Sequence, residues 1–133
     1  MASQKHDFIV ASISRKIREL GFDITYIDGL QANIATSKVL LPPKIINHKP
    51  DIVGENKIGN YCIGEAKTRN DLKSKRTKQQ LIDFSEFVNL YTNNYLIVGI
   101  PLSAESELNQ LFNKLRLRGE STIILRIPDS LLL

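Results

Sequence analysis

The segment KPDIVGENKIGNYCIGEAK, residues 49–67, decides the centre of the predicted fold. Its two apolar runs, DIV and YCIGEAK, flank GENKIGN, whose glycines and asparagines are typical of a hairpin turn. Asp51 stands near the start of the first run, and Glu65 and Lys67 stand near the end of the second. Charged residues are depleted in strand interiors. These side chains therefore either line the solvent side of a hairpin or come together for chemistry.

The spacing of the hairpin predicts which acidic residues face each other. Asp51 and Glu65 are equally far from Ile58, so a turn centred there places them in opposite positions. Directly opposed residues have Cβ atoms ~4.5–5.5 Å apart, and like charges at that distance repel. Glu65 and Lys67 are two residues apart and share one face of their strand. A hairpin in this register brings two carboxylates and one ammonium group together.

Such a group of side chains predicts a divalent metal site. Mg²⁺ prefers oxygen ligands and keeps several waters, and Asp51, Glu65 and the carbonyl of Ala66 supply such oxygens. We expect Mn²⁺ to substitute for it. Lys67 would then orient or help to deprotonate a water for attack on a phosphodiester.

The rest of the chain predicts an α/β fold with a mixed central sheet between helices. Apolar residues at helical spacing predict a first helix that ends at Gly21. Residues 29–50 are predicted to form a long connection, although an additional strand there stays open. The early strands are joined by short turns and are expected to be antiparallel, whereas the later ones alternate with helices and are expected to be parallel. The other predicted elements are strand 22–28, helix 78–91, strand 95–101, helix 103–119 capped by Ser103 and closed by Gly119, and strand 121–128.

The residues Pro50-Asp51 and Glu65-Ala66-Lys67 resemble the signature of the PD-(D/E)xK nuclease superfamily. The resemblance covers roughly residues 7–100 and extends to the order of the predicted elements. It implies a restriction-endonuclease-like αβββαβ core, with Asp51 and Glu65 as metal ligands and Lys67 as the catalytic lysine. The layout is similar to that of archaeal Holliday-junction resolvases, which belong to this superfamily.

The resemblance suggests two further site residues. Members often place a glutamine four residues before an aromatic residue in the helix after the third strand, and Gln80 fits that position, with Gln79 as the second choice. Members also place an acid near the start of the first helix. Asp7, alone or with His6, suits that role better than Glu19, because the site is expected near the N-terminus of this helix.

A basic segment follows the signature lysine. Residues 67–78, KTRNDLKSKRTK, contain six basic residues and one acid. This composition favours an arm that contacts DNA phosphates without reading sequence, although a solvated approach to a helix stays open. His48, three residues before Asp51, is predicted to lie at the surface or against substrate. The predicted phosphate contacts are Arg69, Lys73, Lys75, Arg76 and Lys78.

Composition narrows the class of protein. A chain of 133 residues with 42% apolar content fits a single domain, 1–133, with a net charge of +4. Cys62 is the only cysteine, which excludes an intramolecular disulfide and favours a cytoplasmic setting. The sequence contains no apolar run typical of a signal or a membrane span. It also lacks the glycine spacing of nucleotide-cofactor sites.

The sequence thus predicts a Mg²⁺-dependent DNA endonuclease, either structure-selective like a junction resolvase or of the restriction or repair type. Because one active site cuts one strand, a homodimer is expected. Two alternatives stay open. One is a non-catalytic DNA-binding module that retains the nuclease fold. The other is an α/β interaction protein in which the acids are surface residues.

Overall fold

The computed structural model describes residues 4–28, 48–117 and 119–133, so the connection predicted for 29–50 lies almost wholly outside the described residues. The element order is a helix, three strands, a helix, a strand, a helix and a strand, as predicted. The helices are α1 (Gln4–Glu19), α2 (Lys75–Val88) and α3 (Glu105–Leu115). The strands are β1 (Asp23–Ile27), β2 (Ile52–Glu55), β3 (Tyr61–Ala66), β4 (Tyr95–Pro101) and β5 (Thr122–Ile127).

The five strands form one mixed sheet in the order β1-β2-β3-β4-β5. The pairs β1–β2 and β2–β3 are antiparallel, and the pairs β3–β4 and β4–β5 are parallel. A short turn joins β2 to β3, whereas residues 28–51 separate β1 from β2. The helical crossovers α2 and α3 allow the two parallel pairs. The predicted α/β class and mixed sheet are therefore confirmed.

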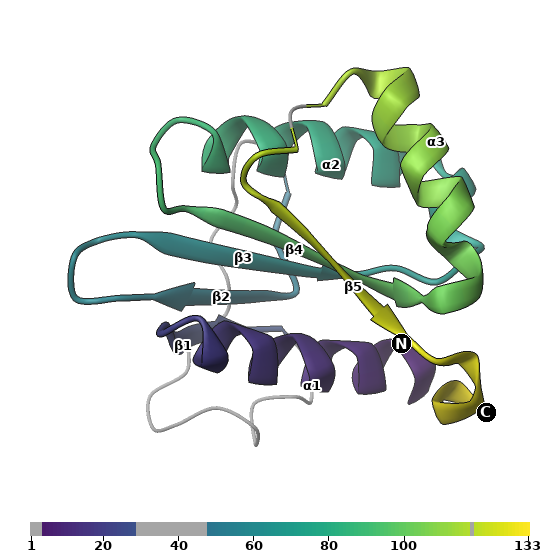
Figure 1. Cartoon of the computed structure of the whole chain (residues 1–133), viewed down its shortest axis with the longest axis horizontal. Coiled ribbons are helices and arrows are strands. Elements are labelled where there is room, and N and C mark those ends of the chain that lie inside the picture. Colours follow the sequence, from purple (N-terminus) through teal and green to yellow (C-terminus); the bar gives the residue numbers. More distant parts are fainter. Residues whose placement is uncertain (1–3, 29–47, 118) are drawn as a thin grey trace.

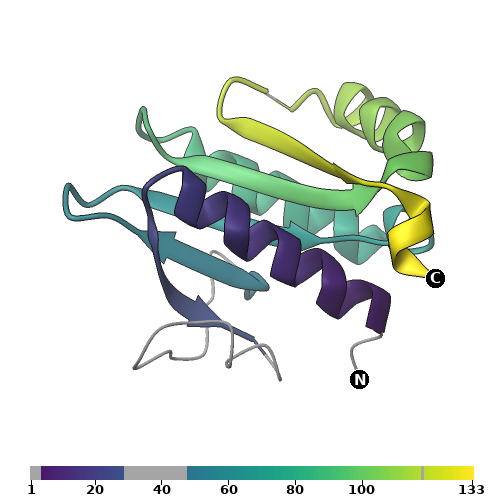
Figure 2. The same ribbon diagram turned by 60° about the horizontal axis from the view of Figure 1, so that its bottom comes forward.

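The helices lie on both faces of the sheet. Figure 1 shows α1 below the sheet and α2 and α3 above it, and Figure 2 shows α1 running along its face. The buried side chains accordingly form two clusters. One joins α1 to the sheet through residues such as Ile9 and Ile13, and the other joins α2 and α3 to the opposite face through Leu81, Phe84 and Leu108. The start of α1 lies at the sheet end where β3 and β4 finish (Figure 1).

Glycines let α1 approach the sheet closely. A Cβ atom added to Gly64 on β3 would lie 2.5 Å from Cγ2 of Ile13, and one on Gly99 of β4 would lie 2.6 Å from Cγ2 of Ile9. Both distances are far shorter than carbon–carbon contact. The alternation of β3 thus turns Gly64 and Ala66 toward α1 and leaves Glu65 on the α2 face, as predicted.

Three elements, β1, α2 and α3, differ in detail from prediction. β1 contains a register shift between Ile24 and Tyr26, which interrupts its regular pairing with β2. α2 begins at Lys75 because Ser74 caps it, its Oγ accepting from Thr77 N–H at 3.0 Å. The prediction that Ser103 caps α3 and that Gly119 closes it is wrong. Asp129 engages the N–H and hydroxyl of Ser103, a 3₁₀ turn (Leu102–Ala104) precedes α3, and the helix ends at Leu115.

Candidate active site

The β2–β3 hairpin places Asp51 opposite Glu65. Ile52 pairs with Gly64, and the pairing continues without a bulge to the turn, so one further step back pairs Asp51 with Glu65. The Asn56 side chain fixes the turn, since its Oδ1 accepts from the N–H groups of Ile58 at 3.1 Å and Asn60 at 2.9 Å. The register predicted from the midpoint at Ile58 is confirmed.

Each of the two acids also accepts a main-chain hydrogen bond across the hairpin. The N–H of Asp51 donates to Glu65 Oε1 at 2.8 Å, and the N–H of Ala66 donates to Asp51 Oδ2 at 2.8 Å. These bonds hold both carboxylates at the end of the strand pair. The acids are therefore not solvated side chains of an ordinary hairpin.

Glu65 lies in an environment that disfavours its charge. Its exposed fraction is only 2%. Burial, and then the charge of Asp51, raise its pKa to about 8, although Lys67 and the Asp51 N–H act in the opposite direction. Desolvation and a nearby like charge both favour the protonated acid. A cation placed between the two carboxylates would reverse this effect.

Lys67, which follows β3 on the same side as Glu65, is the third member of this cluster. Its side chain is nearly buried, and Nζ lies 3.2 Å from Glu65 Oε2. The ammonium also donates to Oε1 of Gln80, which is buried on the inner face of α2. Of the two candidate glutamines, Gln80 is therefore the one that contacts Lys67. The side-chain amide of Gln79 donates to Asp83 at 3.1 Å.

The start of α1 contributes His6 to the cluster. His6 Nε2 lies 3.2 Å from Asp51 Oδ2, and this hydrogen bond, together with the surrounding acids, raises the pKa of His6 against the effect of its burial. Asp7 lies beside His6, with Oδ1 3.9 Å from Nδ1, and does not line the pocket described below. Glu19, at the other end of α1, pairs with Lys16. The N-terminal end of α1 lies beside Asp51, as predicted, and the residue there that contacts Asp51 is His6.

A pocket of about 530 Å³ opens beside the carboxylates. It is bounded by the start of α1, the end of β1, the ends of β2 and β3, and the start of α2. Its polar lining brings acids and bases from distant parts of the chain together. The lining residues are His6, Asp28, His48, Lys49, Asp51, Glu65, Ala66, Lys67, Asp71, Ser74, Arg76, Thr77 and Gln80.

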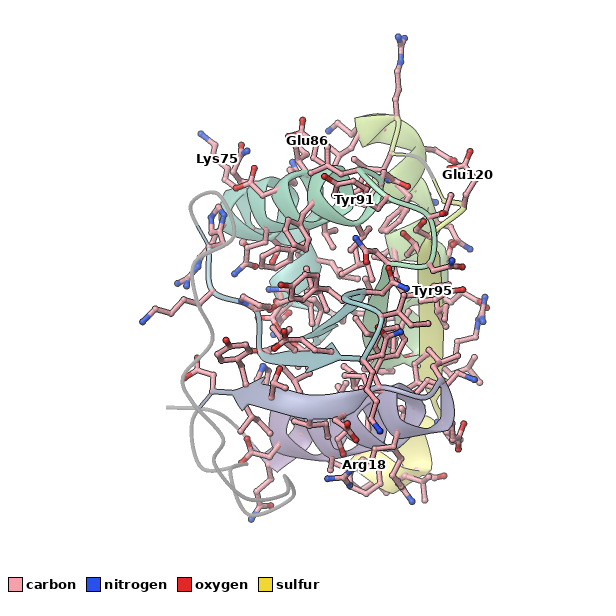
Figure 3. All side chains as sticks on the ribbon, turned by 90° about the vertical axis from the view of Figure 1, so that its left-hand side faces the viewer. Arg18, Lys75, Glu86, Tyr91, Tyr95 and Glu120 are labelled. Atoms are coloured by element: carbon pink, nitrogen blue, oxygen red, sulfur yellow. The ribbon has the colours of Figure 1, made fainter. Side chains whose placement is uncertain are left out.

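The basic segment after Lys67 is folded rather than extended. Residues Asp71–Lys73 form a 3₁₀ turn, and Lys75 begins α2. Arg76 lines the pocket, and Lys75 projects outward from the start of α2 (Figure 3). Lys73 is exposed and Lys78 half-buried. Arg69 instead turns to α3, where Nε lies 3.4 Å from Glu107 Oε1 and the guanidinium donates to the Ser103 carbonyl.

Three charged residues of the pocket lining, Asp28, Lys49 and Asp71, were not predicted from the sequence. Asp28 follows β1, and its N–H donates to the Asp51 carbonyl at 2.9 Å; its position at the end of the strand next to β2 was the available signal. Lys49 adds a positive charge two residues before Asp51. His48, predicted to lie at the surface or against substrate, lines the pocket and lies 2.8 Å from Asp83 Oδ2 through Nδ1.

Two kinds of feature are absent from the described part of the chain. Within residues 4–28, 48–117 and 119–133, no group of three or more histidine, cysteine, aspartate or glutamate side chains is arranged to hold a metal ion. Across the same ranges, no helix is both long enough and apolar enough to cross a membrane.

Comparison with known proteins identifies no relative: no family model, curated protein or solved structure matches this chain. Any functional assignment therefore depends on the residues of the site.

Proposed function

We propose that this protein is a metal-dependent DNA endonuclease that hydrolyses phosphodiester bonds. The observation that carries the proposal is the meeting of Asp51, Glu65 and Lys67 at one pocket. Asp51 directly precedes β2, Glu65 lies on β3 and Lys67 directly follows β3, an order similar to that of the PD-(D/E)xK signature. Gln80 on α2, bonded to Lys67, adds a fourth feature of that superfamily.

The fold supports the same proposal. The order α1-β1-β2-β3-α2-β4 matches the αβββαβ core of restriction-endonuclease-like proteins. The antiparallel hairpin of β2 and β3 leads into a parallel pair with β4, so the acids lie where the sheet changes from one arrangement to the other. We infer that the chain has the restriction-endonuclease-like fold, with α3 and β5 added to the core.

The residues fit Mg²⁺, or Mn²⁺ in its place. Asp51, Glu65 and the Ala66 carbonyl offer hard oxygen ligands. Burial and, second, the charge of Asp51 raise the pKa of Glu65, and a cation between the two carboxylates would favour its ionised form. Mg²⁺ usually needs only one or two protein carboxylates and keeps several waters. A closed cage of three acidic or histidine ligands is therefore not required. When bound, the ion would supply Lewis-acid chemistry at the phosphodiester.

Lys67 would act on the attacking water and on the developing charge. An ammonium group has three donors, of which one points to Glu65 and one to Gln80. The third is left to orient the water or to stabilise a phosphate oxygen as negative charge accumulates. Water supplies the new oxygen at phosphorus, and one P–O bond of the DNA strand breaks.

The charges around the pocket support a DNA substrate. Arg76 and Lys49 line it, and the exposed Lys73 and Lys75 extend the positive surface along the start of α2. These cations would neutralise strand phosphates. One site cuts one strand, so we propose that two copies act together on duplex or junction DNA. We also propose a cytoplasmic location, where the buried thiol of Cys62 would stay reduced.

The test is cleavage of a supercoiled plasmid and of a four-way junction with Mg²⁺. Asp51→Ala and Lys67→Ala should abolish cleavage, while Asp23→Ala on β1 and Lys114→Ala on α3, both exposed and away from the pocket, should leave it intact. Equal cleavage by wild type and the two site variants rejects the assignment.

A non-catalytic DNA-binding module is the second candidate. It is favoured by the main-chain hydrogen bonds of the two acids, which give them a structural role as well. Salt-sensitive DNA binding by a wild-type protein that cuts neither substrate in Mg²⁺ or Mn²⁺ would select this candidate.

A further inference from the structure

His48 and Asp83 form an acid–histidine pair beside the proposed active site. His48 Nδ1 lies 2.8 Å from Asp83 Oδ2, and Asp83 is only 3% exposed on the inner side of α2. The other oxygen of Asp83 accepts from Gln79 Nε2 at 3.1 Å. The edge of the imidazole packs on Phe84, with ring centroids 6.4 Å apart and planes at 82°. The ring is thus held by a hydrogen bond and by an aromatic contact.

This arrangement determines which ring nitrogen is available to a ligand. A carboxylate only accepts hydrogen bonds, so the proton shared with Asp83 lies on Nδ1. Nε2 is left for other contacts, and no residue within the described ranges hydrogen-bonds it. Because His48 lines the pocket that also holds Asp51 and Lys67, a substrate there can reach this nitrogen.

The surroundings of His48 favour an anion. Lys49 and Arg76 line the same pocket, as do the acids Asp28 and Asp71. Asp71 Oδ2 already accepts from the N–H and the hydroxyl of Thr68 at 2.8 and 2.9 Å, and the first turn of α2 carries no acidic residue. The proposed metal ligands lie on the β2–β3 side, whereas these cations come from the start of α2 and from the residues that precede Asp51. The pocket therefore has a second polar region next to the hydrolytic cluster.

We propose that His48, positioned by Asp83 and assisted by Arg76, binds a backbone phosphate adjacent to the one that is cleaved. The inference rests on the proposed function and specifies the substrate further: a polynucleotide strand that presents at least two phosphates to the pocket. When both of its ring nitrogens carry a proton, His48 donates Nδ1–H to Asp83 and Nε2–H to a phosphate oxygen, and the second of these is a charge-assisted hydrogen bond. Asp83 is a positioning residue, since it acts through His48.

The competing explanation is that the His48–Asp83 hydrogen bond only holds the residues before Asp51 against α2 and that His48 does not contact substrate. Two substitutions separate the roles. Asn at position 48 can still donate to Asp83 from the place of Nδ1 but has no atom at Nε2, whereas Ala removes both contacts. His48→Asn therefore preserves the hydrogen bond to Asp83 and removes the proposed phosphate contact.

The experiment measures DNA binding without cleavage. Anisotropy with a labelled duplex and a labelled four-way junction in Ca²⁺ gives Kd for wild type, His48→Asn, His48→Ala, Asp83→Asn and Arg76→Gln, with Lys114→Gln as the matched charge control. We expect Kd to rise roughly tenfold for His48→Asn, equivalent to about 1.4 kcal/mol, with a melting temperature close to that of wild type. Arg76→Gln should weaken binding similarly, Asp83→Asn less, and Lys114→Gln hardly at all.

Hydrolysis adds a second readout. The p-nitrophenyl ester of thymidine 5′-phosphate carries one phosphate, so the ratio of DNA to ester kcat/KM should fall at least fivefold in His48→Asn, mainly through KM for DNA. Wild-type Kd in His48→Asn, or an equal loss on both substrates together with a lower melting temperature, overturns the inference. If wild type binds DNA but hydrolyses neither substrate, the nuclease proposal fails, and the Kd comparison still decides the role of His48.

Discussion

Asp51 and Glu65 lie opposite each other at the end of the β2–β3 hairpin, and the main-chain N–H of Asp51 donates to the Glu65 carboxylate at 2.8 Å. The hydrogen bond secures Glu65 but leaves two carboxyl groups close together at a largely buried position, where the ionised form of Glu65 is disfavoured. The Lys67 ammonium, with Nζ 3.2 Å from Glu65 Oε2, offsets part of this effect.

Divalent metal should stabilise the wild-type fold and not the Asp51→Asn variant. Asn can still accept the Ala66 N–H but lacks the charge that attracts a cation. Ligand at 100 times its Kd contributes about 2.7 kcal/mol, so the wild-type melting temperature should rise by several degrees in Mg²⁺ or Mn²⁺. Thermal unfolding with and without EDTA measures this, with Asp23→Asn as control. An equal metal-induced rise in Asp51→Asn would place the ion elsewhere.

Glu65→Gln should gain stability relative to wild type as the pH rises. The pKa of Glu65 is about 8 in the folded protein against an ordinary value of 4.5. Between these values the unfolded chain loses its proton while the folded protein keeps it, so wild-type stability falls as the pH rises from 4.5 to 8. Gln cannot ionise and escapes this loss.

Urea unfolding in EDTA at pH 5 and pH 8 tests the prediction. The difference between Glu65→Gln and wild type should grow by roughly 1 kcal/mol or more, since a tenfold change in an acid dissociation constant corresponds to ~1.4 kcal/mol. A difference that is the same at both pH values would mean that Glu65 does not titrate in this range.

Lys67→Met should remove catalysis while the buried hydrophobic stem is kept. A positioned acid–base group contributes ~10²–10⁴-fold to rate, so plasmid cleavage should fall by at least 100-fold. Gln80→Met should have a smaller effect, about tenfold, because Lys67 keeps its contact with Glu65. Single-turnover cleavage rates compare the two variants. A larger loss in Gln80→Met than in Lys67→Met would reverse the assigned roles.

Gly64→Ala should destabilise the fold by about 1–3 kcal/mol, the usual cost of overpacking. The new Cβ would meet Cγ2 of Ile13 and Cγ2 of Ile52, each at 2.5 Å. Adding Ile13→Ala removes the first of these two atoms, so the cost of the double variant should be less than the sum of the single costs. Gly119→Ala, with no atom within 4 Å of the added carbon, is the control, and unfolding free energies from urea titration give the comparison.

The sequence predicted most of what depends on local pattern. The order of elements, the mixed sheet and the opposition of Asp51 to Glu65 follow from apolar periodicity and a short turn. The periodicity of each element and the register of the hairpin depend on residues close together in the chain, and the intervening helices then favour parallel pairing of the later strands. The assignment of Gln80 rather than Gln79 to the inner side of α2 followed from helical spacing in the same way.

Side-chain contacts between residues far apart in the chain could not be predicted from local sequence pattern. Ser103 hydrogen-bonds Asp129 and therefore does not cap α3. Arg69, in the basic segment, pairs with Glu107 on α3. The pair His48–Asp83 joins residues 35 apart in the chain. In each case two side chains satisfy each other only after the sheet and helices have packed, and neither residue signals its partner locally.

The alternation along β3 has a consequence for how this hairpin can vary. Glu65 on one face of β3 belongs to the polar cluster, and Gly64 on the other face makes room for α1. Ile58, at the tip of the turn, is 86% exposed, so other residues would be tolerated at this position. The length of the turn is constrained more strongly. Inserting or deleting one residue would turn each side chain of β3 to the opposite face of the sheet, and a carboxylate would then face the tightly packed α1.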